Sequence, residues 1–364
     1  MIKGCASTAK VGAHGNTPLQ RALAGQRLDR EQGLALFDGD LLSLGAAANE
    51  LCRRRHGDSP RTYVIDRNIN YTNICQSGCR FCAFWRTSDA PDAYLLSHDD
   101  VLAKVAEAER LGATQILLQG GLHPQLGLEW FEELFRAIKA AHRVHIHSLS
   151  PPEIVHLAKL SGLSFTQVLV RLRAAGLDSL PGGGAEILSD EVRSQLSPHK
   201  CSAEQWFEVM RAAHSLGLPT TATMMFGHIE TLAHRVEHLL RLRELQDETH
   251  GFTAFIPWTY QPGNTALGGE PTGAHDYLRT LAISRLLLDN FEHLQASWVT
   301  QGPKIAQLAL LFGADDLGAV MIEENVVRAA GASFSLSEQE FIRLIEDLGY
   351  RAARRDTYYH LLEG

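Results

Sequence analysis

The chain has 364 residues, of which 45% are apolar and 21% are charged, so it is long enough and apolar enough to fold around a substantial core. Its formal net charge of −8, with no basic stripe carrying interleaved aromatics, argues against a nucleic-acid partner. No apolar run approaches the ~18 residues that span a bilayer, and the first sixteen residues hold no apolar signal region, so we expect a cytoplasmic protein with no membrane partner.

The predicted elements begin, in chain order, with residues 1–16, which we expect to form a disordered tail. Residues 17–60 place apolar side chains at helical spacing and predict two or three N-terminal helices. From residue 61 onward, short apolar runs alternate with longer helical patterns. The predicted strands are 62–65 together with 68–74, then 115–119, 144–148, 177–180, 219–226, 252–258, 294–299 and 317–322. The predicted helices are 98–111, 128–141, 152–161, 203–216, 231–247, 274–291 and 303–312.

This alternation of strands and helices predicts an α/β fold, a (β/α)8 TIM-type barrel over residues 61–330. Residues 331–364 carry a further helical pattern at 335–350, and we expect them to form a helical extension packed on the barrel. No linker interrupts the chain, so we expect a single domain with these extensions. In such a barrel the reacting groups are expected at the carboxyl ends of the strands.

Three of the six cysteines stand in the spacing C-x3-C-x2-C directly after the first predicted strand. Three thiolates can hold three irons of one [4Fe–4S] cluster, which leaves the fourth iron open to a small chelating ligand. The alternative is a structural zinc, which prefers four closed ligands and would need His56 or Cys52 as the fourth. The predicted metal ligands are Cys75, Cys79 and Cys82, whereas Cys5, Cys52 and Cys201 are interpreted as small apolar or incidental residues.

The cysteine spacing resembles the signature of the radical S-adenosylmethionine (radical SAM) superfamily. The resemblance implies S-adenosylmethionine as a second cofactor at the open iron, and a 5′-deoxyadenosyl radical as the reactive species. It also implies that Phe81, just before the third cysteine, lies against the adenine; a core aromatic is the other interpretation. Gly120 and Gly121 end the second strand, where the superfamily binds the methionine amino group. Leu122 stands where the superfamily pattern has an acid, so only backbone carbonyls carry over.

Three further residues near strand ends are predicted to bind the cofactor. Glu186 follows the run PGGGA, and a carboxylate there can accept hydrogen bonds from ribose hydroxyls or an ammonium group. A solvated acid at the start of a helix is the alternative interpretation. Ser148 ends the third predicted strand, and His123 follows the glycine pair.

Longer motifs resemble the dehypoxanthine futalosine cyclases, also called cyclic dehypoxanthinyl futalosine synthases, radical SAM enzymes of the futalosine route to menaquinone. The resemblance covers residues 61–330. Its motifs are DRNINYTNIC (66–75), GGLHP (120–124), SPPEI (150–154), DSLPGGGAEIL (178–188), TATMMFGH (221–228) and FTAFIPWTYQP (252–262). Aminofutalosine synthase and the deazaflavin-cofactor synthases share the cluster loop and remain alternatives, as does a non-catalytic protein stabilised by zinc.

The cyclase resemblance implies an oxidoreductase that acts on dehypoxanthine futalosine, a ribose that carries a benzoate through a ketone arm. The radical would remove the ribose C4′ hydrogen, and the new carbon radical would close on the benzoate ring. The adduct would then lose one electron and one proton. An electron donor such as flavodoxin or ferredoxin is implied as a partner.

Such a reaction needs a base, a cradle for sugar hydroxyls and a donor for a carboxylate. His145 and His147 share one face of the third strand, and with His228, after the fifth strand, they are the predicted acid–base groups. Histidines packed in the barrel are the alternative interpretation. The candidate substrate ligands are Arg80 in the cysteine loop and Tyr260, Gln261 and Asn264 after the sixth strand.

Overall fold

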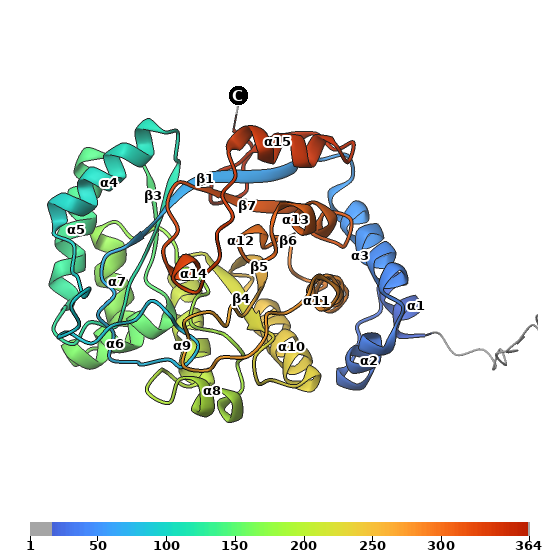
Figure 1. The fold of residues 1–364 in the computed structure, drawn as a ribbon, viewed down its shortest axis with the longest axis horizontal. Coiled ribbons are helices and arrows are strands. Elements are labelled where there is room, and N and C mark those ends of the chain that lie inside the picture. The colour runs from blue at the N-terminus through green and yellow to red at the C-terminus, as the bar shows by residue number, and fades with distance from the viewer. Residues whose placement is uncertain (1–16, 363–364) are drawn as a thin grey trace, which may run out of the picture.

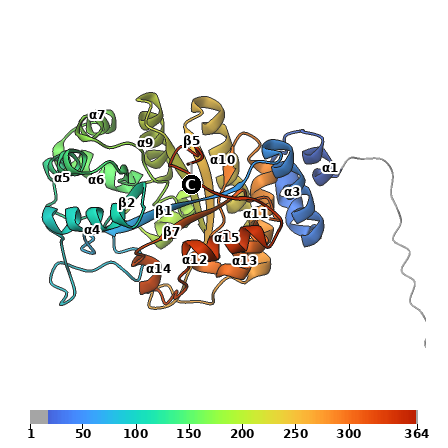
Figure 2. The ribbon, with the colours of Figure 1, turned by 90° about the horizontal axis from the view of Figure 1, so that it is seen from above.

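The computed structural model of the protein describes residues 17–362, so the predicted tail 1–16 lies outside the described residues (Figure 1). The described chain opens with α1 (Pro18–Leu23), α2 (Arg30–Ala35), the 3-10 turn η1 (Leu36–Asp38) and α3 (Leu41–His56). These helices lie on the outer side of α11 (Ala274–Leu287) (Figures 1 and 2). Gly45 of α3 is so close to its neighbours that a Cβ there would lie 2.5 Å from the Phe312 ring, so the absence of a side chain permits the packing.

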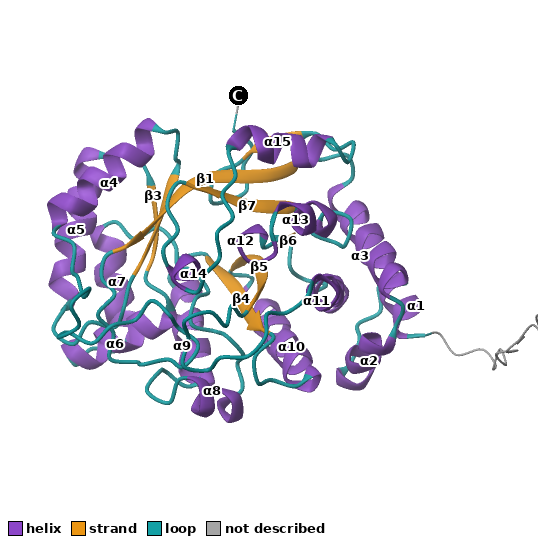
Figure 3. Ribbon diagram, in the orientation of Figure 1, coloured by secondary structure: helices purple, strands orange, loops and turns teal. Residues whose placement is uncertain are grey.

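The strands lie inside a shell of helices (Figure 3), and their parallel pairings close into a ring. The strands are β1 (Arg61–Asn70), β2 (Gln115–Gln119), β3 (His145–Ser148), β4 (Thr220–Phe226), β5 (Phe252–Thr259), β6 (His293–Leu294), β7 (Asp316–Met321) and β8 (Ala352–Arg354). Two sheets, β3-β2-β1-β7 and β4-β5-β6, are joined by single bridges. The bridges are His147 to Ser179, Leu180 to Thr220 and Gln295 to Asp316. Ser179 and Leu180 thus take the fourth position of the ring, and the predicted (β/α)8 barrel is confirmed.

Helices fill the connections between the strands (Figure 2). They are α4 (His98–Arg110), α5 (Leu128–Ala141), α6 (Pro151–Ser161), α7 (Phe165–Ala175), α8 (Asp190–Leu196), α9 (Ala203–Ser215), α10 (Leu232–Thr249), α12 (Trp298–Gln301), α13 (Pro303–Ala309), α14 (Val326–Ala329) and α15 (Glu338–Glu346). None of these helices combines the length and hydropathy needed to cross a bilayer, within residues 17–362.

Two strand predictions were wrong in detail. The predicted strand 294–299 shrinks to the two residues of β6, because Trp298 begins a helix and its buried indole donates a hydrogen bond to the Ala319 carbonyl (3.0 Å). The predicted strand 177–180 keeps only isolated bridges. In both segments the residue content suits a strand, but contacts with the rest of the fold determine the backbone conformation that forms.

Polar side chains line the inside of the barrel. β1 is buried along its whole length, and it is one strand rather than the two predicted segments. Its alternate residues split between two faces, because Ile69 packs with the helix-facing core while Asn68 and Asn70 hydrogen-bond to each other (3.3 Å). Asp66 accepts a hydrogen bond from Gln115 of β2 across the same interior (3.0 Å). This polar interior interrupts the apolar run, which explains why the sequence reads as two segments.

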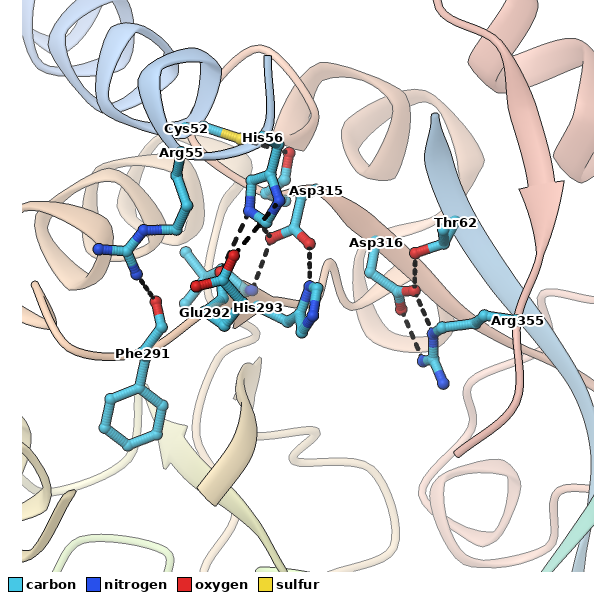
Figure 4. Close-up of polar contacts among 12 residues, drawn as sticks. Cys52, Arg55, His56, Thr62, Phe291, Glu292, His293, Asp315, Asp316 and Arg355 are labelled. Atoms are coloured by element: carbon cyan, nitrogen blue, oxygen red, sulfur yellow. Dashed lines mark hydrogen bonds and ion pairs between the residues drawn. The ribbon is translucent and has the colours of Figure 1, made fainter. Parts of the chain in front are cut away.

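The C-terminal segment closes the amino end of the barrel. Beyond α15, the chain forms a strand as well as the predicted helix, and β8 pairs with the first residues of β1. Arg355 then makes a buried ion pair with Asp316 (2.5 Å), whose carboxylate also accepts from Thr62 (2.6 Å) (Figure 4). Because the amino end is filled in this way, the loops at the carboxyl ends of the strands are the remaining place for a site.

Candidate active site

The cysteine loop follows β1 and is held from three sides by backbone hydrogen bonds. The amide of Cys75 donates to the Arg86 carbonyl (3.0 Å), and the amide of the next residue, Gln76, donates to the Leu122 carbonyl after β2 (3.1 Å). The amide of Arg80 donates to the Leu196 carbonyl at the end of α8 (2.9 Å). The loop therefore sits at the carboxyl end of the barrel, where the sequence predicted it.

The thiols of Cys79 and Cys82 are shielded from solvent, whereas Cys75 is only partly buried. Burial raises the pKa of Cys79 to about 12, and burial also raises the pKa of Cys82. The negative charges of the other loop cysteines raise the pKa of Cys79 further, so the thiols lie near enough to one another to interact. A metal that coordinates these sulfurs would hold them deprotonated.

The geometry does not suit a single zinc ion in this loop. Zinc–sulfur bonds of about 2.3 Å bring the ligand atoms of one ion within about 4 Å of each other. Within residues 17–362, the group of three metal-ligating side chains that meets such a criterion is Cys52, His56 and Asp315, with ligand atoms within 4.8 Å. The three loop thiols are not all this close to one another, which favours a cluster of several irons over one zinc ion.

Cys52 and His56 also lie at the wrong end of the barrel to serve as a fourth zinc ligand. They belong to the last turns of α3, beside His293 and Asp315 (Figure 4). Helix α3 precedes β1, whereas the cysteine loop follows the far end of that strand. Asp315 already accepts hydrogen bonds from Arg285 (2.6 Å), from His293 (2.6 Å) and from the Leu294 amide (2.8 Å). This group is therefore a satisfied polar network that ties α3 to the start of β7.

Two predicted cofactor ligands, Phe81 and Glu186, meet beside Cys79. The ammonium group of Lys200 lies 3.0 Å from Glu186 Oε1 and 5.4 Å from the centre of the Phe81 ring. Burial lowers the pKa of Lys200, but the charges of Glu186 and Cys79 outweigh burial and raise it, so the side chain is a cation. Lys200 is a residue that sequence reasoning missed, because no motif marks it.

Glu186 has an unused acceptor. Its side chain is only 6% exposed, and Oε2 has no hydrogen-bond partner among the described residues. Arg193 lies near this oxygen, at 3.6 Å. The backbone of Glu186 has a φ of +40°, a left-handed value that a side-chain-bearing residue adopts at a cost. A strained residue that presents a buried, unpartnered carboxylate oxygen is suited to accept hydrogen bonds from a ligand.

Gly120 and Gly121 let the end of β2 approach the cysteine loop. A Cβ at Gly121 would lie 2.2 Å from the Ile74 carbonyl oxygen and 2.8 Å from the Cβ of Cys75. A Cβ at Gly120 would lie 2.6 Å from the Tyr71 ring. The amide of Gly121 also donates to the carbonyl of Thr72 (2.9 Å). The glycine pair therefore has a packing role that is independent of any cofactor.

His123 and Ser148 are less available. The carbonyl of His123 accepts from His156 Nε2 (2.8 Å), and its Nδ1 accepts from the Gln125 amide (3.2 Å). Ser148 is fully buried, and its hydroxyl donates to the Leu118 carbonyl of β2 (2.7 Å). His123 is in the same turn as the glycine pair, whereas the Ser148 hydroxyl is engaged within the sheet.

The predicted histidines of β3 do share a face, since each ring lies 2.6 Å from the Ser179 hydroxyl. His145 begins the strand and packs on Tyr358 of the C-terminal segment, so the structure does not bring it to the cysteine loop. His147 lies two residues further along β3. Burial lowers the pKa of His147 to about 3, so its ring is neutral. His228 follows β4 and has both ring nitrogens occupied, by the Met225 carbonyl (3.1 Å) and by Glu230 (2.9 Å).

The loop after β5 lies against the cysteine loop, because the Leu267 amide donates to the Arg80 carbonyl (2.8 Å). Tyr260 is buried and bonds within this loop to Thr265 (2.5 Å). Gln261 bonds to Thr259 (3.2 Å), Asn264 bonds to the Ala329 carbonyl (2.9 Å), and the Arg80 guanidinium is exposed and bonds to the Gln195 carbonyl (3.2 Å).

Further amides at the barrel mouth were also missed. Asn70 donates to the Gln119 carbonyl (3.2 Å), and Asn325, after β7, donates to the side chain of Asn70 (3.3 Å). The signal was present in the sequence, because Asn70 belongs to the motif DRNINYTNIC, but only the alternation of β1 shows which members face inward.

Known proteins resemble the chain over almost its entire length. The family profile described as the radical SAM superfamily matches residues 69–242, and the profile of the CofH/MqnC C-terminal region matches residues 249–363. The cyclic dehypoxanthine futalosine synthase of Streptomyces coelicolor is 47% identical over 351 residues, which cover 94% of this chain and 88% of the relative. A protein of the same name from Halalkalibacterium halodurans is 43% identical and covers 94% of both chains.

A second enzyme activity occurs among similar proteins. The 5-amino-6-(D-ribitylamino)uracil–L-tyrosine 4-hydroxyphenyl transferase of Methanoculleus marisnigri is 42% identical over 358 residues, covering 95% of this chain and 97% of the relative. Among solved structures, methylornithine synthase superposes with a TM-score of 0.72 at 18% identity, covering 93% of this chain and 97% of that one. That likeness supports the fold and says nothing of the substrate.

Proposed function

The chain belongs to the radical SAM superfamily, in the group that shares the CofH/MqnC C-terminal region, and from this membership we propose that it is a cyclic dehypoxanthine futalosine synthase of menaquinone biosynthesis. The observation that carries the proposal is the likeness to the Streptomyces enzyme at 47% identity over 94% of the chain. The cofactor site at Cys79 supports it, because an aromatic ring, a cation and an unpartnered carboxylate oxygen meet there.

The proposed cofactor site uses residues from four strand ends. Cys75, Cys79 and Cys82 would hold one [4Fe–4S] cluster, which when bound supplies the electron that cleaves S-adenosylmethionine and so yields the 5′-deoxyadenosyl radical. Phe81 would pack on the adenine, and Oε2 of Glu186 would accept from the ribose hydroxyls. The proposed contacts to the methionine amino group are the carbonyls of Gly120 and Gly121. His123 and Ser148 are proposed as further cofactor-binding residues.

In the proposed reaction the substrate loses its ribose C4′ hydrogen, closes a ring onto the benzoate, and gives up one electron and one proton. The electron lost at the end equals the electron spent on the cofactor, so the products are 5′-deoxyadenosine, methionine, the cyclic product and a proton. The interior amides at the barrel mouth and the loop after β5 would bind the sugar. The proposed substrate ligands are Arg80, Tyr260, Gln261 and Asn264.

His147 and His228 are the proposed proton-transfer groups. The support for this proposal is their placement: the His147 ring is held in the barrel interior by Ser179, and the His228 ring is held at the mouth by the Met225 carbonyl. We assign no catalytic role to His145, because it packs on Tyr358 at the amino end of the barrel. A flavodoxin or ferredoxin is the proposed electron donor, and the cytoplasm the proposed location.

The transferase activity is the second candidate, because the archaeal relative is 42% identical over nearly all of both chains. A product assay separates the two. The protein is loaded with iron and sulfide under anaerobic conditions, reduced, and given S-adenosylmethionine with either dehypoxanthine futalosine or the ribitylaminouracil and tyrosine pair. The cyclase proposal expects a product of the first substrate that has lost two hydrogens. 5′-Deoxyadenosine formed only with the second pair would refute it.

A further inference from the structure

Helix α6 turns two buried polar side chains toward the cysteine loop. The helix begins at Pro151, after the N-cap Ser150, with two prolines in its first turn, and its inner face carries Glu153 and His156, three residues apart. Both side chains are nearly enclosed, at 3% and 7% exposure. Neither belongs to the cofactor or substrate ligands assigned above.

Glu153 accepts four hydrogen bonds from three parts of the chain. One oxygen, Oε1, accepts from the Tyr71 hydroxyl (2.8 Å) and from the Gly120 amide (3.2 Å). The other, Oε2, accepts from the amide (2.8 Å) and the hydroxyl (2.5 Å) of Ser150. The second pair only caps the helix, whereas the first pair joins the helix to the end of β1 and to the glycine turn.

The glycine turn in turn touches the first cysteine. Tyr71 lies under Gly120, and Gly121 lies against Ile74 and the Cβ of Cys75. A carboxylate that grips both the Tyr71 hydroxyl and the Gly120 amide therefore fixes two of the surfaces that locate Cys75. Burial raises the pKa of Glu153, while the four hydrogen bonds oppose that shift.

His156 makes a parallel connection to the same loop. Its Nδ1 lies 2.9 Å from the side-chain nitrogen Nε2 of Gln76, the residue after Cys75, and its Nε2 lies 2.8 Å from the His123 carbonyl. A neutral ring that accepts from Gln76 and donates to His123 satisfies both contacts. Helix α6 thus holds the turn after β2 on one side and the cysteine loop on the other.

We propose that Glu153 is a positioning residue for the cofactor site: from helix α6 it fixes the Gly120–Gly121 turn against Cys75, and so sets how the cluster and the methionine end of S-adenosylmethionine face each other. This inference rests on the proposed radical SAM function. Residues that orient the ligands of a metal site typically alter metal affinity or activity about 10- to 100-fold when they are replaced.

Two variants of Glu153 and one control variant test the role of this carboxylate. Glu153→Ala removes all four hydrogen bonds. Glu153→Gln keeps an oxygen that can still accept from Tyr71 and Gly120, so it should act as a partial rescue. Glu109→Gln is the matched control, because Glu109 also accepts a backbone amide, from Arg143 (3.1 Å), but at the amino end of the barrel before β3.

The test uses the full chain loaded with iron and sulfide. We would measure iron content, the electron paramagnetic resonance spectrum of the reduced cluster with and without S-adenosylmethionine, and the KM values for cofactor and acceptor. The expected result is that Glu153→Ala raises the KM for S-adenosylmethionine about 10- to 100-fold. Its spectral change on cofactor binding should weaken, and the KM for the acceptor should stay unaltered. Glu153→Gln should lie between Glu153→Ala and the parent protein, and Glu109→Gln should match the parent.

The inference is overturned if Glu153→Gln and Glu153→Ala both keep the parent spectrum and the parent KM for S-adenosylmethionine. It is equally overturned if Glu109→Gln changes these values as much, since the effect would then be general destabilisation. Reductive cleavage of S-adenosylmethionine can be followed as 5′-deoxyadenosine with any acceptor. A parent protein that cleaves the cofactor but forms no cyclic product would refute the cyclase proposal alone and leave this test intact.

Discussion

Replacement of Gly121 by alanine tests whether the turn after β2 locates the cluster loop. The new Cβ would lie 2.2 Å from the backbone oxygen of Ile74 and 2.8 Å from the Cβ of Cys75. Ordinary van der Waals contact starts near 3.4 Å, and a backbone carbonyl cannot rotate away as the tip of a long side chain can. The backbone of Ile74, next to the first cluster ligand Cys75, would therefore have to move by about 1 Å.

This displacement should affect both the stability of the fold and the rate of the reaction. Overpacking of a buried contact costs about 1–3 kcal/mol of folding free energy, so the melting temperature should fall by only a few degrees. A misplacement of about 1 Å at a reacting centre can cost on the order of 100-fold in rate. We therefore expect Gly121→Ala to remain folded while its iron content or its rate of 5′-deoxyadenosine formation falls steeply.

The assay compares Gly121→Ala with Gly273→Ala, because a Cβ at Gly273 meets no atom within 4 Å and its φ of −74° suits any residue. Iron, sulfide, the spectrum of the reduced cluster and cofactor cleavage are measured for both, with melting temperature as the check on folding. The reasoning is refuted if Gly121→Ala keeps its cluster and cleaves S-adenosylmethionine within about twofold of the parent rate.

Three further predictions concern the cluster ligands, the cofactor pocket and the barrel interior. Alanine at any one of the three loop cysteines should abolish cleavage of S-adenosylmethionine, while Cys201→Ala should keep the cluster; loss of iron in Cys201→Ala would show that the ligand assignment is wrong. Lys200→Met removes the nearer of the two cations beside Glu186 and leaves only Arg193, at 3.6 Å, which should cost up to about 3 kcal/mol of stability and weaken cofactor binding. Lys200→Arg should recover most of both, and a Lys200→Met protein with unchanged stability in denaturant titrations would contradict this. Burial raises the pKa of Asp66 to about 6. The contribution of this carboxyl to the free energy of unfolding is therefore fully present below its unfolded pKa near 4, and it is lost as the pH rises through about 6. Asp66→Asn can still accept a hydrogen bond from Gln115. Near pH 8 its free energy of unfolding should exceed that of the parent by up to about 3 kcal/mol, and near pH 4 the two should match. Equal denaturation midpoints of variant and parent at both pH values would refute the assignment.

Some features of this protein follow from short stretches of sequence. The spacing of Cys75, Cys79 and Cys82 specifies three ligands in one loop whatever the rest of the chain does, because only seven peptide bonds join Cys75 to Cys82 and limit their separation. The alternation of strands and helices predicts the barrel for a similar reason, since periodicity and crossover length are local properties. The barrel in turn explains why Gly120 and Glu186, which are distant in sequence, both approach the cysteine loop.

Other features depend on which segments meet in space. Lys200 has no motif, and it matters only because its loop returns to lie between Glu186 and Phe81. Glu153 looks like an ordinary helix-capping acid until Tyr71 and Gly120 are found to donate to its other oxygen, Oε1. Sequence patterns record local spacing, whereas burial and hydrogen-bond partners between distant segments arise only when the barrel closes.

The same distinction decides between residues that look alike in sequence. His145 and His147 are two positions apart on one face of β3, as the alternation predicted. The C-terminal segment then covers His145 with Tyr358 at the amino end of the barrel, while His147 remains one step closer to the carboxyl end. The sequence alone determined that a three-cysteine loop would sit at the mouth of a barrel. The tertiary structure decided which side chains reach that mouth, because the partners at each end of the barrel come from segments that are far apart in the sequence.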